Sequence, residues 1–265
     1  MSRVWLRATA LAVVVVAAVA GLTVYFSTEK VPLCLVSGVK AWRPPFDPAT
    51  HRYEVVILDQ SACFFDMDRQ QRLVGTLRLS QAKWLAGAVP GAADTIRLED
   101  VAHGVEFVTQ RGRLGARVLD LHTNRTLYVL QFNGFTWNPR FGPDPPSHGL
   151  SLAPDRPELW VLDAPNSVVH VFDVSALPGG PPRPLEDVRL SKPISGDENP
   201  CSRACGRIGS LLHSADGRFV YVGDAGDVID TRTRQIVANL EALHNSRVQL
   251  ELDWVRGKAV FPRRS

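Results

Sequence analysis

Two histidines and one glutamate have side chains and sequence positions suited to acid–base or metal chemistry. His148 lies at the start of an expected inner strand, His213 lies about four residues deeper in the corresponding strand of the next unit, and Glu198 lies in the loop before that strand. Converging imidazole and carboxylate groups can bind a divalent cation or polarise a carbonyl. The histidines lack metal-ligand spacing, so we predict no cofactor and keep a divalent metal as the alternative. In a second alternative, His148 only bonds neighbouring structural units and His213 only opens a turn.

The segment before His148 is the most unusual in composition. Residues 132–149 read FNGFTWNPRFGPDPPSHG, which is rich in aromatic residues, glycine and proline. An exposed loop that carries Phe135, Trp137 and Arg140 would form a binding edge for a small molecule or a protein. The alternative is a loop that covers its own fold with these aromatics. The predicted binding residues are therefore Phe135, Trp137, Arg140, His148, Glu198 and His213.

Catalytic residues cannot be assigned from motifs in this chain. There is no G-x-S-x-G nucleophile elbow, no P-loop and no G-x-G-x-x-G that follows a strand. The question of whether the protein is an enzyme stays open at this point.

The first thirty residues are typical of export. Arg3 and Arg7 precede an uncharged apolar run at 8–26, and Glu29 and Lys30 follow it. The length of the run favours a transmembrane anchor over a cleaved signal peptide, although Ala18-Val19-Ala20 is a small-x-small cleavage sequence. The arginines predict an extracytoplasmic location for the remaining chain, either membrane-anchored or secreted. We expect two parts: the anchor or signal at 1–30 and one domain at 31–265.

Four cysteines in an exported chain predict disulfide bonds. Cys201 and Cys205 are close enough in sequence to close a loop, and we favour that pair. The pairing of Cys34 and Cys63 stays open.

The body of the chain contains four similar units. Asp66, Asp120, Asp173 and Asp230 each end an apolar run, and they follow one another at intervals of 54, 53 and 57 residues. Another apolar run of strand length precedes each of them and ends near Asp59, Gln110, Asp163 or Asp224. This pattern predicts β-meanders, in which the aspartate caps the turn after the second strand. Because one meander cannot bury both faces, several units must pack side by side.

The third and fourth units resemble the repeats of YVTN-type, lactonase-like β-propeller proteins. The resemblance rests on His148-Gly149, Ala153-Pro154-Asp155, 159–161 and 171–173, and on Ala215-Asp216-Gly217, 220–222 and 228–230 in the next unit. It is good over 147–240 and approximate over 50–130. It implies an all-β propeller of about 55-residue repeats with four or five blades, either small or incomplete. In such a fold His148 and His213 would lie near the mouth of the central channel.

Charge and composition narrow the function classes. The chain has 30 Lys+Arg and 27 Asp+Glu, a net charge of +3, which is too small for a nucleic-acid-binding protein. We predict an extracytoplasmic binding or interaction module whose ligand is a protein or a small molecule. The alternative is a lactonase-like hydrolase or a metal-dependent oxidoreductase with its site at the channel mouth.

Overall fold

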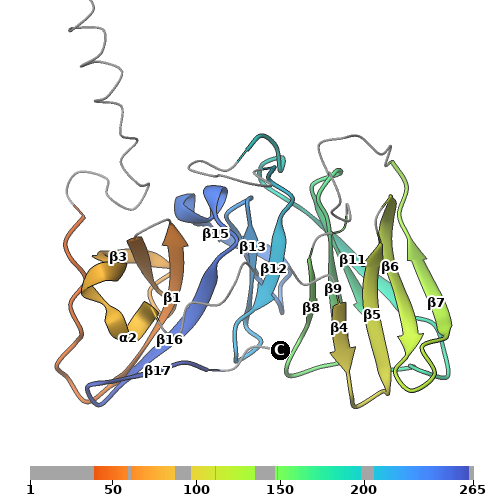
Figure 1. Ribbon diagram of the computed structural model, residues 1–265, viewed down its shortest axis with the longest axis horizontal. Coiled ribbons are helices and arrows are strands. Elements are labelled where there is room, and N and C mark those ends of the chain that lie inside the picture. The colour runs from red at the N-terminus through yellow and green to blue at the C-terminus, as the bar shows by residue number, and fades with distance from the viewer. Residues whose placement is uncertain are drawn as a thin grey trace, which may run out of the picture. The chain divides into compact units, whose positions relative to one another are not determined.

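The fold consists of four antiparallel β-sheets with little helix. The structure, a computed structural model, describes residues 39–58, 61–86, 97–110, 112–134, 147, 149–197 and 206–262 (Figure 1). All four sheets belong to one compact unit, Leu33–Ser265. Among the described residues, short helical segments accompany them at η2 (Leu79–Gln81), α2 (Lys83–Ala86) and η4 (Glu241–Asn245).

We number the sheets 1 to 4 in chain order. Sheet 1 has the strand order β17-β16-β1-β2-β3, with β1 (Thr50–Leu58), β2 (Ser61–Asp66), β3 (Arg72–Arg78), β16 (Gln249–Val255) and β17 (Lys258–Val260). Sheet 2 is β4 (Arg97–Asp100), β5 (Val105–Gln110), β6 (Arg113–Asp120) and β7 (Thr126–Gln131). Sheet 3 is β8 (Leu150–Leu152), β9 (Glu158–Asp163), β10 (Val168–Asp173) and β11 (Arg183–Arg189). Sheet 4 is β12 (Ser210–His213), β13 (Phe219–Gly223), β14 (Asp227–Asp230) and β15 (Gln235–Asn239).

The predicted repeat is confirmed at the level of single residues. Strands β2, β6, β10 and β14 end at the four aspartates of the repeat. The predicted caps also form: Asp120 Oδ1 accepts hydrogen bonds from the backbone N–H of His122 at 3.0 Å and of Thr123 at 2.7 Å. Asp230 Oδ1 accepts the equivalent bond from the backbone N–H of Thr233 at 3.0 Å. Each meander therefore turns at a side-chain cap that is local in sequence.

Apolar runs occur where a strand is buried on both faces. In β9, Leu159 and Val161 belong to an apolar cluster shared with sheet 2, whereas Trp160 and Leu162 belong to a cluster shared with sheet 4. Successive side chains of a strand point to opposite faces, so a sheet packed between two others needs apolar residues at every position. Strand β13 follows the same rule between sheets 3 and 1.

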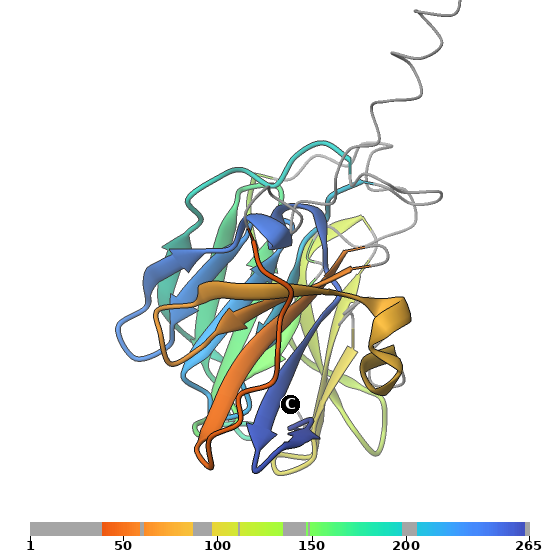
Figure 2. The same ribbon diagram turned by 90° about the vertical axis from the view of Figure 1, so that its left-hand side faces the viewer.

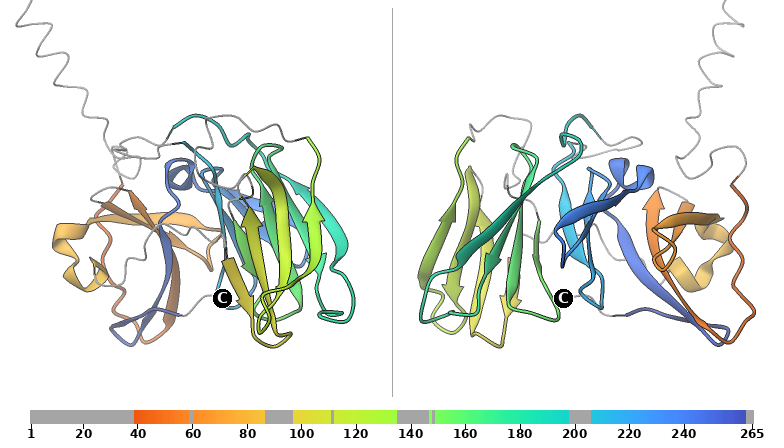
Figure 3. Two further views of the ribbon diagram at one scale, coloured as in Figure 1. Left: turned by 45° about the vertical axis from the view of Figure 1, so that its right-hand side comes forward. Right: turned by 180° about the vertical axis from the view of Figure 1, so that it is seen from behind.

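The sheets pack as the blades of a β-propeller, in the order 2, 3, 4, 1. Separate apolar clusters join sheet 2 to 3, sheet 3 to 4 and sheet 4 to 1. Figures 1 and 3 show this series from opposite sides. Within the described ranges, no buried apolar cluster joins sheet 1 to sheet 2. The predicted all-β propeller of four or five blades is thus confirmed with four sheets, and the apolar interfaces among the described residues form an open series of three.

Sheet 1 combines strands from both ends of the described chain. Strand β16 pairs with β1 from Thr50 opposite Val255 to Val56 opposite Gln249. The far face of this sheet is covered by its own chain: Trp42 stacks on Phe64 with ring centroids 4.3 Å apart, and Leu85 of α2 is fully buried beside them. Figure 2 looks onto this end of the molecule.

The N-terminal and cysteine predictions fall mostly outside the described residues. No helix in the described part of the chain is long and apolar enough to span a membrane, and the apolar run at 8–26 is not in that part. Cys63 in β2 is fully buried and disulfide-bonded, with a partner outside the described residues. Cys34, Cys201 and Cys205 also lie outside them, so the favoured Cys201–Cys205 pair stays a prediction.

Candidate functional site

Most of the predicted site residues are outside the described part of the structure. These are Phe135, Trp137, Arg140, His148 and Glu198. The base of the aromatic loop is described: the Phe132 ring lies 3.9 Å from the imidazole of His170, and Asn166 Nδ2 donates to the carbonyl oxygen of Asn133 at 2.9 Å. The loop therefore starts from a fixed position on sheet 3.

His213, the one predicted site residue in the described ranges, lies between sheets 3 and 4. It ends β12, is fully buried and contacts the edge of Trp160 at 5.5 Å between ring centroids. Ser151 Oγ accepts the His213 backbone N–H at 3.2 Å and forms a second hydrogen bond with Nδ1 at 2.7 Å. Nε2, the other ring nitrogen, is buried and has no hydrogen-bond partner among the described residues.

The surroundings keep His213 uncharged. Burial, followed by the nearby charge of Arg156, lowers the pKa of His213 to about 3. The imidazole is enclosed by the two sheets, and its part in ligand binding stays a prediction.

A cleft of about 310 Å³ lies between the turns of sheets 2 and 3. One wall comes from the β4–β5 turn, where the backbone N–H of His103 donates to Asp100 Oδ1 at 3.2 Å and Nδ1–H donates to Oδ2 at 2.6 Å. The carboxylate is nearly buried, with a side-chain exposure of 10%, while the imidazole is 26% exposed. Asp100 thus fixes both the turn and the ring. The residues lining the cleft are Asp100, Ala102, His103, Leu152, Ala153, Pro154, Arg156 and Pro157.

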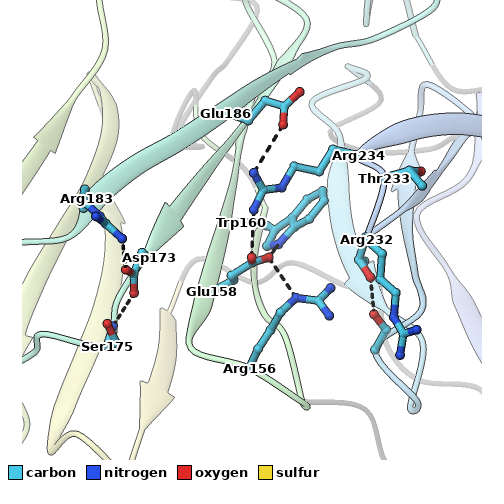
Figure 4. Close-up of polar contacts among 12 residues, drawn as sticks. Arg156, Glu158, Trp160, Asp173, Ser175, Arg183, Glu186, Arg232, Thr233 and Arg234 are labelled. Carbon is cyan, nitrogen blue, oxygen red and sulfur yellow. Dashed lines mark hydrogen bonds and ion pairs between the residues drawn. The ribbon is translucent and has the colours of Figure 1, made fainter.

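The opposite wall is held by an ion-pair network on sheets 3 and 4. Figure 4 shows Glu158 between two arginines: its carboxylate lies 3.1 Å from Arg156 Nε and 2.9 Å from an Arg234 terminal nitrogen. Arg234 also reaches Glu186 at 3.3 Å, and Arg156 reaches Asp155 at 3.0 Å. Both guanidinium charges are therefore compensated by carboxylates. This wall offers a fixed, largely apolar surface of alanine, leucine and proline rather than a free cation.

The cleft contains one oriented acid–base group. Because Nδ1–H donates to Asp100, the neutral imidazole of His103 has its lone pair on Nε2, which makes no hydrogen bond with a described residue. Such a histidine can accept a hydrogen bond from a ligand hydroxyl or take a proton from water. The lining residues include no serine, threonine or cysteine, so they supply no side-chain nucleophile of those types.

Sequence reasoning missed this pair. Its signal is Asp-x-x-His followed by Gly104, at φ +65°, in the turn before β5. A short turn motif of this kind does not reveal which neighbouring turn it faces, so the sequence alone does not single out His103. No group of three or more His, Cys, Asp or Glu side chains in the described ranges is arranged to hold a metal ion.

No protein-family model and no curated protein matches the chain. Among solved structures it is similar to the periplasmic gluconolactonase of Pseudomonas aeruginosa, with 14% identity and a TM-score of 0.40 over 79% of this chain and 56% of that one. It is also similar to Kuenenia stuttgartiensis hydrazine synthase, with 16% identity and a TM-score of 0.39 over 68% and 43% of the two chains. The Myceliophteria thermophila Cps50 β-propeller domain has 12% identity and a TM-score of 0.32 over 81% and 55%.

The chain spans about half the length of these solved structures. No activity, ligand or partner of this protein follows from similarities at this level. The YVTN-type repeat stays a prediction from the sequence.

Proposed function

We propose that the protein is an extracytoplasmic binding module that takes a small neutral ligand in the cleft between sheets 2 and 3. The observation that carries this proposal is the Asp100–His103 hydrogen bond of 2.6 Å, which orients an imidazole acceptor at an open cleft. The apolar facing wall suits a ligand with an apolar face. The ligand then needs a hydroxyl that donates to His103 Nε2. A carboxylate would instead meet a lone pair beside the Asp100 charge, which disfavours it.

Ligand binding can be tested with two small rings of similar size. We expect saturation-transfer NMR to detect cyclohexanol bound to the full chain in detergent micelles, with much weaker binding of cyclohexanecarboxylate. The variant His103→Ala should weaken cyclohexanol binding at least tenfold, or about 1.4 kcal/mol. The matched control is His122→Ala, which removes an exposed imidazole from another turn of the same sheet. Equal effects of the two variants would refute the site.

Hydrolysis by an activated water is a second candidate, favoured by the same Asp–His pair. In this role His103 Nε2 takes a proton from water as the water oxygen bonds to the ester carbonyl carbon, and Asp100 stabilises the imidazolium that forms. The imidazolium then returns the proton to the leaving oxygen as the ester C–O bond breaks. δ-Gluconolactone is a suitable probe because it has both an ester carbonyl and hydroxyls. Turnover above the spontaneous rate that is lost in both His103→Ala and Asp100→Asn would establish a hydrolase. Binding without turnover would establish the module.

The proposal also includes the apolar run at 8–26 and the aromatic loop. The run at 8–26 is proposed to anchor the protein in a membrane, with the propeller outside the cytoplasm. Phe135, Trp137 and Arg140 are proposed to extend the binding surface beyond the base of the loop at Phe132. No cofactor is proposed.

A further inference from the structure

The exposed aromatic side chains of the described residues gather at the far end of sheet 1. Phe46 is 99% exposed, Trp84 39% and Phe261 36%, and no other aromatic residue appears among the exposed large hydrophobics. Trp84 lies against both Phe261 and Trp254, with ring centroids 6.3 and 6.2 Å apart. Val260, next to Phe261, is 47% exposed. Exposed aromatic side chains that gather at one end of a domain mark an interaction surface.

A groove lies beside these exposed aromatic side chains. It has a volume of about 400 Å³ and is lined by Pro44, Pro45, Phe46, Asp47, Pro48, Trp254, Arg256 and Gly257. Trp254 Nε1 donates to the Pro45 carbonyl oxygen at 3.2 Å, which fixes the proline segment against sheet 1. We call Phe46, Trp84, Trp254, Val260 and Phe261 the aromatic face.

Four basic residues, which we call the basic rim, are exposed in the segments that supply the aromatic face. Lys40, Arg43, Arg256 and Lys258 are exposed in the same segments, 39–48 and 254–262. The acidic residue in these exposed segments is Asp47, whose Oδ1 lies 2.7 Å from His51 Nε2. The combination of Trp and Phe with Lys and Arg matches the interfacial region of a bilayer that contains anionic lipids.

The chain enters this part of the fold soon after the predicted anchor. The apolar run ends at Phe26, and the described chain begins at Val39. The twelve residues from 27 to 38 can span at most about 40 Å when fully extended. The first described segment, 39–48, also supplies Phe46, Lys40 and Arg43 to the face and its rim.

We propose that the aromatic face of sheet 1 rests on the membrane interface, with its basic rim against anionic headgroups. This inference rests on the proposed membrane anchor. A lipid surface is favoured over a second copy of the chain because a symmetric dimer through this face would bring two sets of four cations together. The two Trp rings and two Phe rings supply the amphipathic and apolar contacts that an interface accepts.

The test uses the full chain reconstituted in vesicles of about 70% phosphatidylcholine and about 30% phosphatidylglycerol, with brominated acyl chains that quench tryptophan. All proteins compared carry Trp137→Phe, so that Trp5→Phe then removes the reporter of the anchor and leaves Trp84 and Trp254 to report on the face beside the buried Trp42 and Trp160. We expect substantial quenching in this variant, and at least a twofold loss of quenching when Phe46→Ser, Arg256→Glu and Lys258→Glu are added. Val129→Ser, a 53% exposed position on sheet 2, is the matched control and should change nothing.

The outcomes separate the face from the anchor. If Trp5 is quenched but the Trp5→Phe protein is not, the anchor stands and the membrane-facing role is overturned; a cross-linked dimer through the face would overturn it as well. If Trp5 is not quenched, the anchor fails. Flotation with the same vesicles then decides. Vesicle binding that Phe46→Ser weakens at least fivefold supports the membrane-facing role of the aromatic face. Absence of vesicle binding overturns that role.

Discussion

Sheets 1 and 2 lie at the two ends of the blade series, and each has one face that no other described blade covers. On sheet 1 that face is apolar and is covered by Trp42, Ala82 and Leu85 from its own chain. On sheet 2, Val105 and Phe107 of β5 pack on sheet 3, so the alternating residues Glu106 and Val108 point to the other side. Arg97 binds the Glu106 carboxylate there through two bonds of 2.7 Å.

Sheets 1 and 2 differ in how the face without a neighbouring blade is kept from exposing apolar residues. A blade without a neighbour must either cover its apolar face or carry polar residues on it, because exposed sheet faces promote association. The sequence of β5, VEFVTQ, contains the polar residues that this requires, whereas β1 reads THRYEVVIL and has an uninterrupted apolar run. We therefore expect the sheet 1 end to depend on packing and the sheet 2 end on charge.

The largest expected effect is at the apolar end. Replacing Trp42 by alanine removes its stacking on Phe64 and its edge contact with Tyr53 at 5.8 Å. The free energy of unfolding should fall by about 3–5 kcal/mol, as for other buried aromatic residues. Urea unfolding followed by circular dichroism measures this. A loss below about 1 kcal/mol would mean that the covered face contributes little to stability.

Acid should destabilise the interface between sheets 3 and 4, where His213 is buried. This effect must be known before the stabilities of sheets 1 and 2 are compared at different pH. The pKa of His213 is lowered to about 3 from 6.5, so the unfolded chain binds a proton below pH 6.5 while the folded chain does not. Stability should therefore fall from pH 6.5 towards pH 3, by at most about 1.4 kcal/mol per pH unit. His213→Leu should flatten that slope in unfolding experiments, and an unchanged slope would contradict the buried neutral imidazole.

Close packing at the sheet 1 end can be tested without removing an aromatic ring. A Cβ atom at Gly75 would lie 2.6 Å from Trp42 Cα, a backbone atom that cannot move alone. Gly75→Ala should therefore lower the free energy of unfolding by about 1–3 kcal/mol. Gly179→Ala is the control, because its Cβ would meet only the Ala176 carbonyl oxygen at an ordinary 3.7 Å. Equal melting temperatures for the two variants would contradict the packing described.

His170 should show a pH dependence opposite to that of His213. Burial opposes its protonation, but hydrogen bonds to Asp163 at 3.2 Å and Asp187 at 2.6 Å outweigh burial and raise the pKa of His170. Its contribution to stability is present below pH 6.5 and is lost as pH rises through the raised pKa. His170→Gln should thus cost more stability at about pH 5.5 than at about pH 8.5. Thermal melts at both values check the sign.

The smallest effect is expected at the charged end. The Arg97 side chain is 59% exposed, so Arg97→Ala should lower the free energy of unfolding less than any change above, and less still in high salt. A double-mutant cycle with Glu106→Gln isolates the pair. An Arg97–Glu106 coupling energy as large as the loss of stability in Trp42→Ala would contradict the proposed difference between sheets 1 and 2.

Local signals in the sequence were enough to predict the blades. Pairing between strands that lie far apart in the sequence could not be predicted in this way. The aspartates that end β2, β6, β10 and β14 were found because each caps its own turn within three residues. Strands β16 and β17 were missed because β16 pairs with β1 across most of the chain, from Thr50 to Val255. The Asp100–His103 pair is a local turn, but its functional setting depends on Pro154 and Arg156 of the next blade.

The proposed ligand cleft is tested most directly by the imidazole resonance of His103. In ¹H–¹³C spectra of the full chain titrated with cyclohexanol, we expect a saturable shift at His103 Cε1 and none at His122. Ligand binding in this cleft would be contradicted if cyclohexanol binds without shifting the His103 resonance. It would also be contradicted if the resonances of both histidines shift alike.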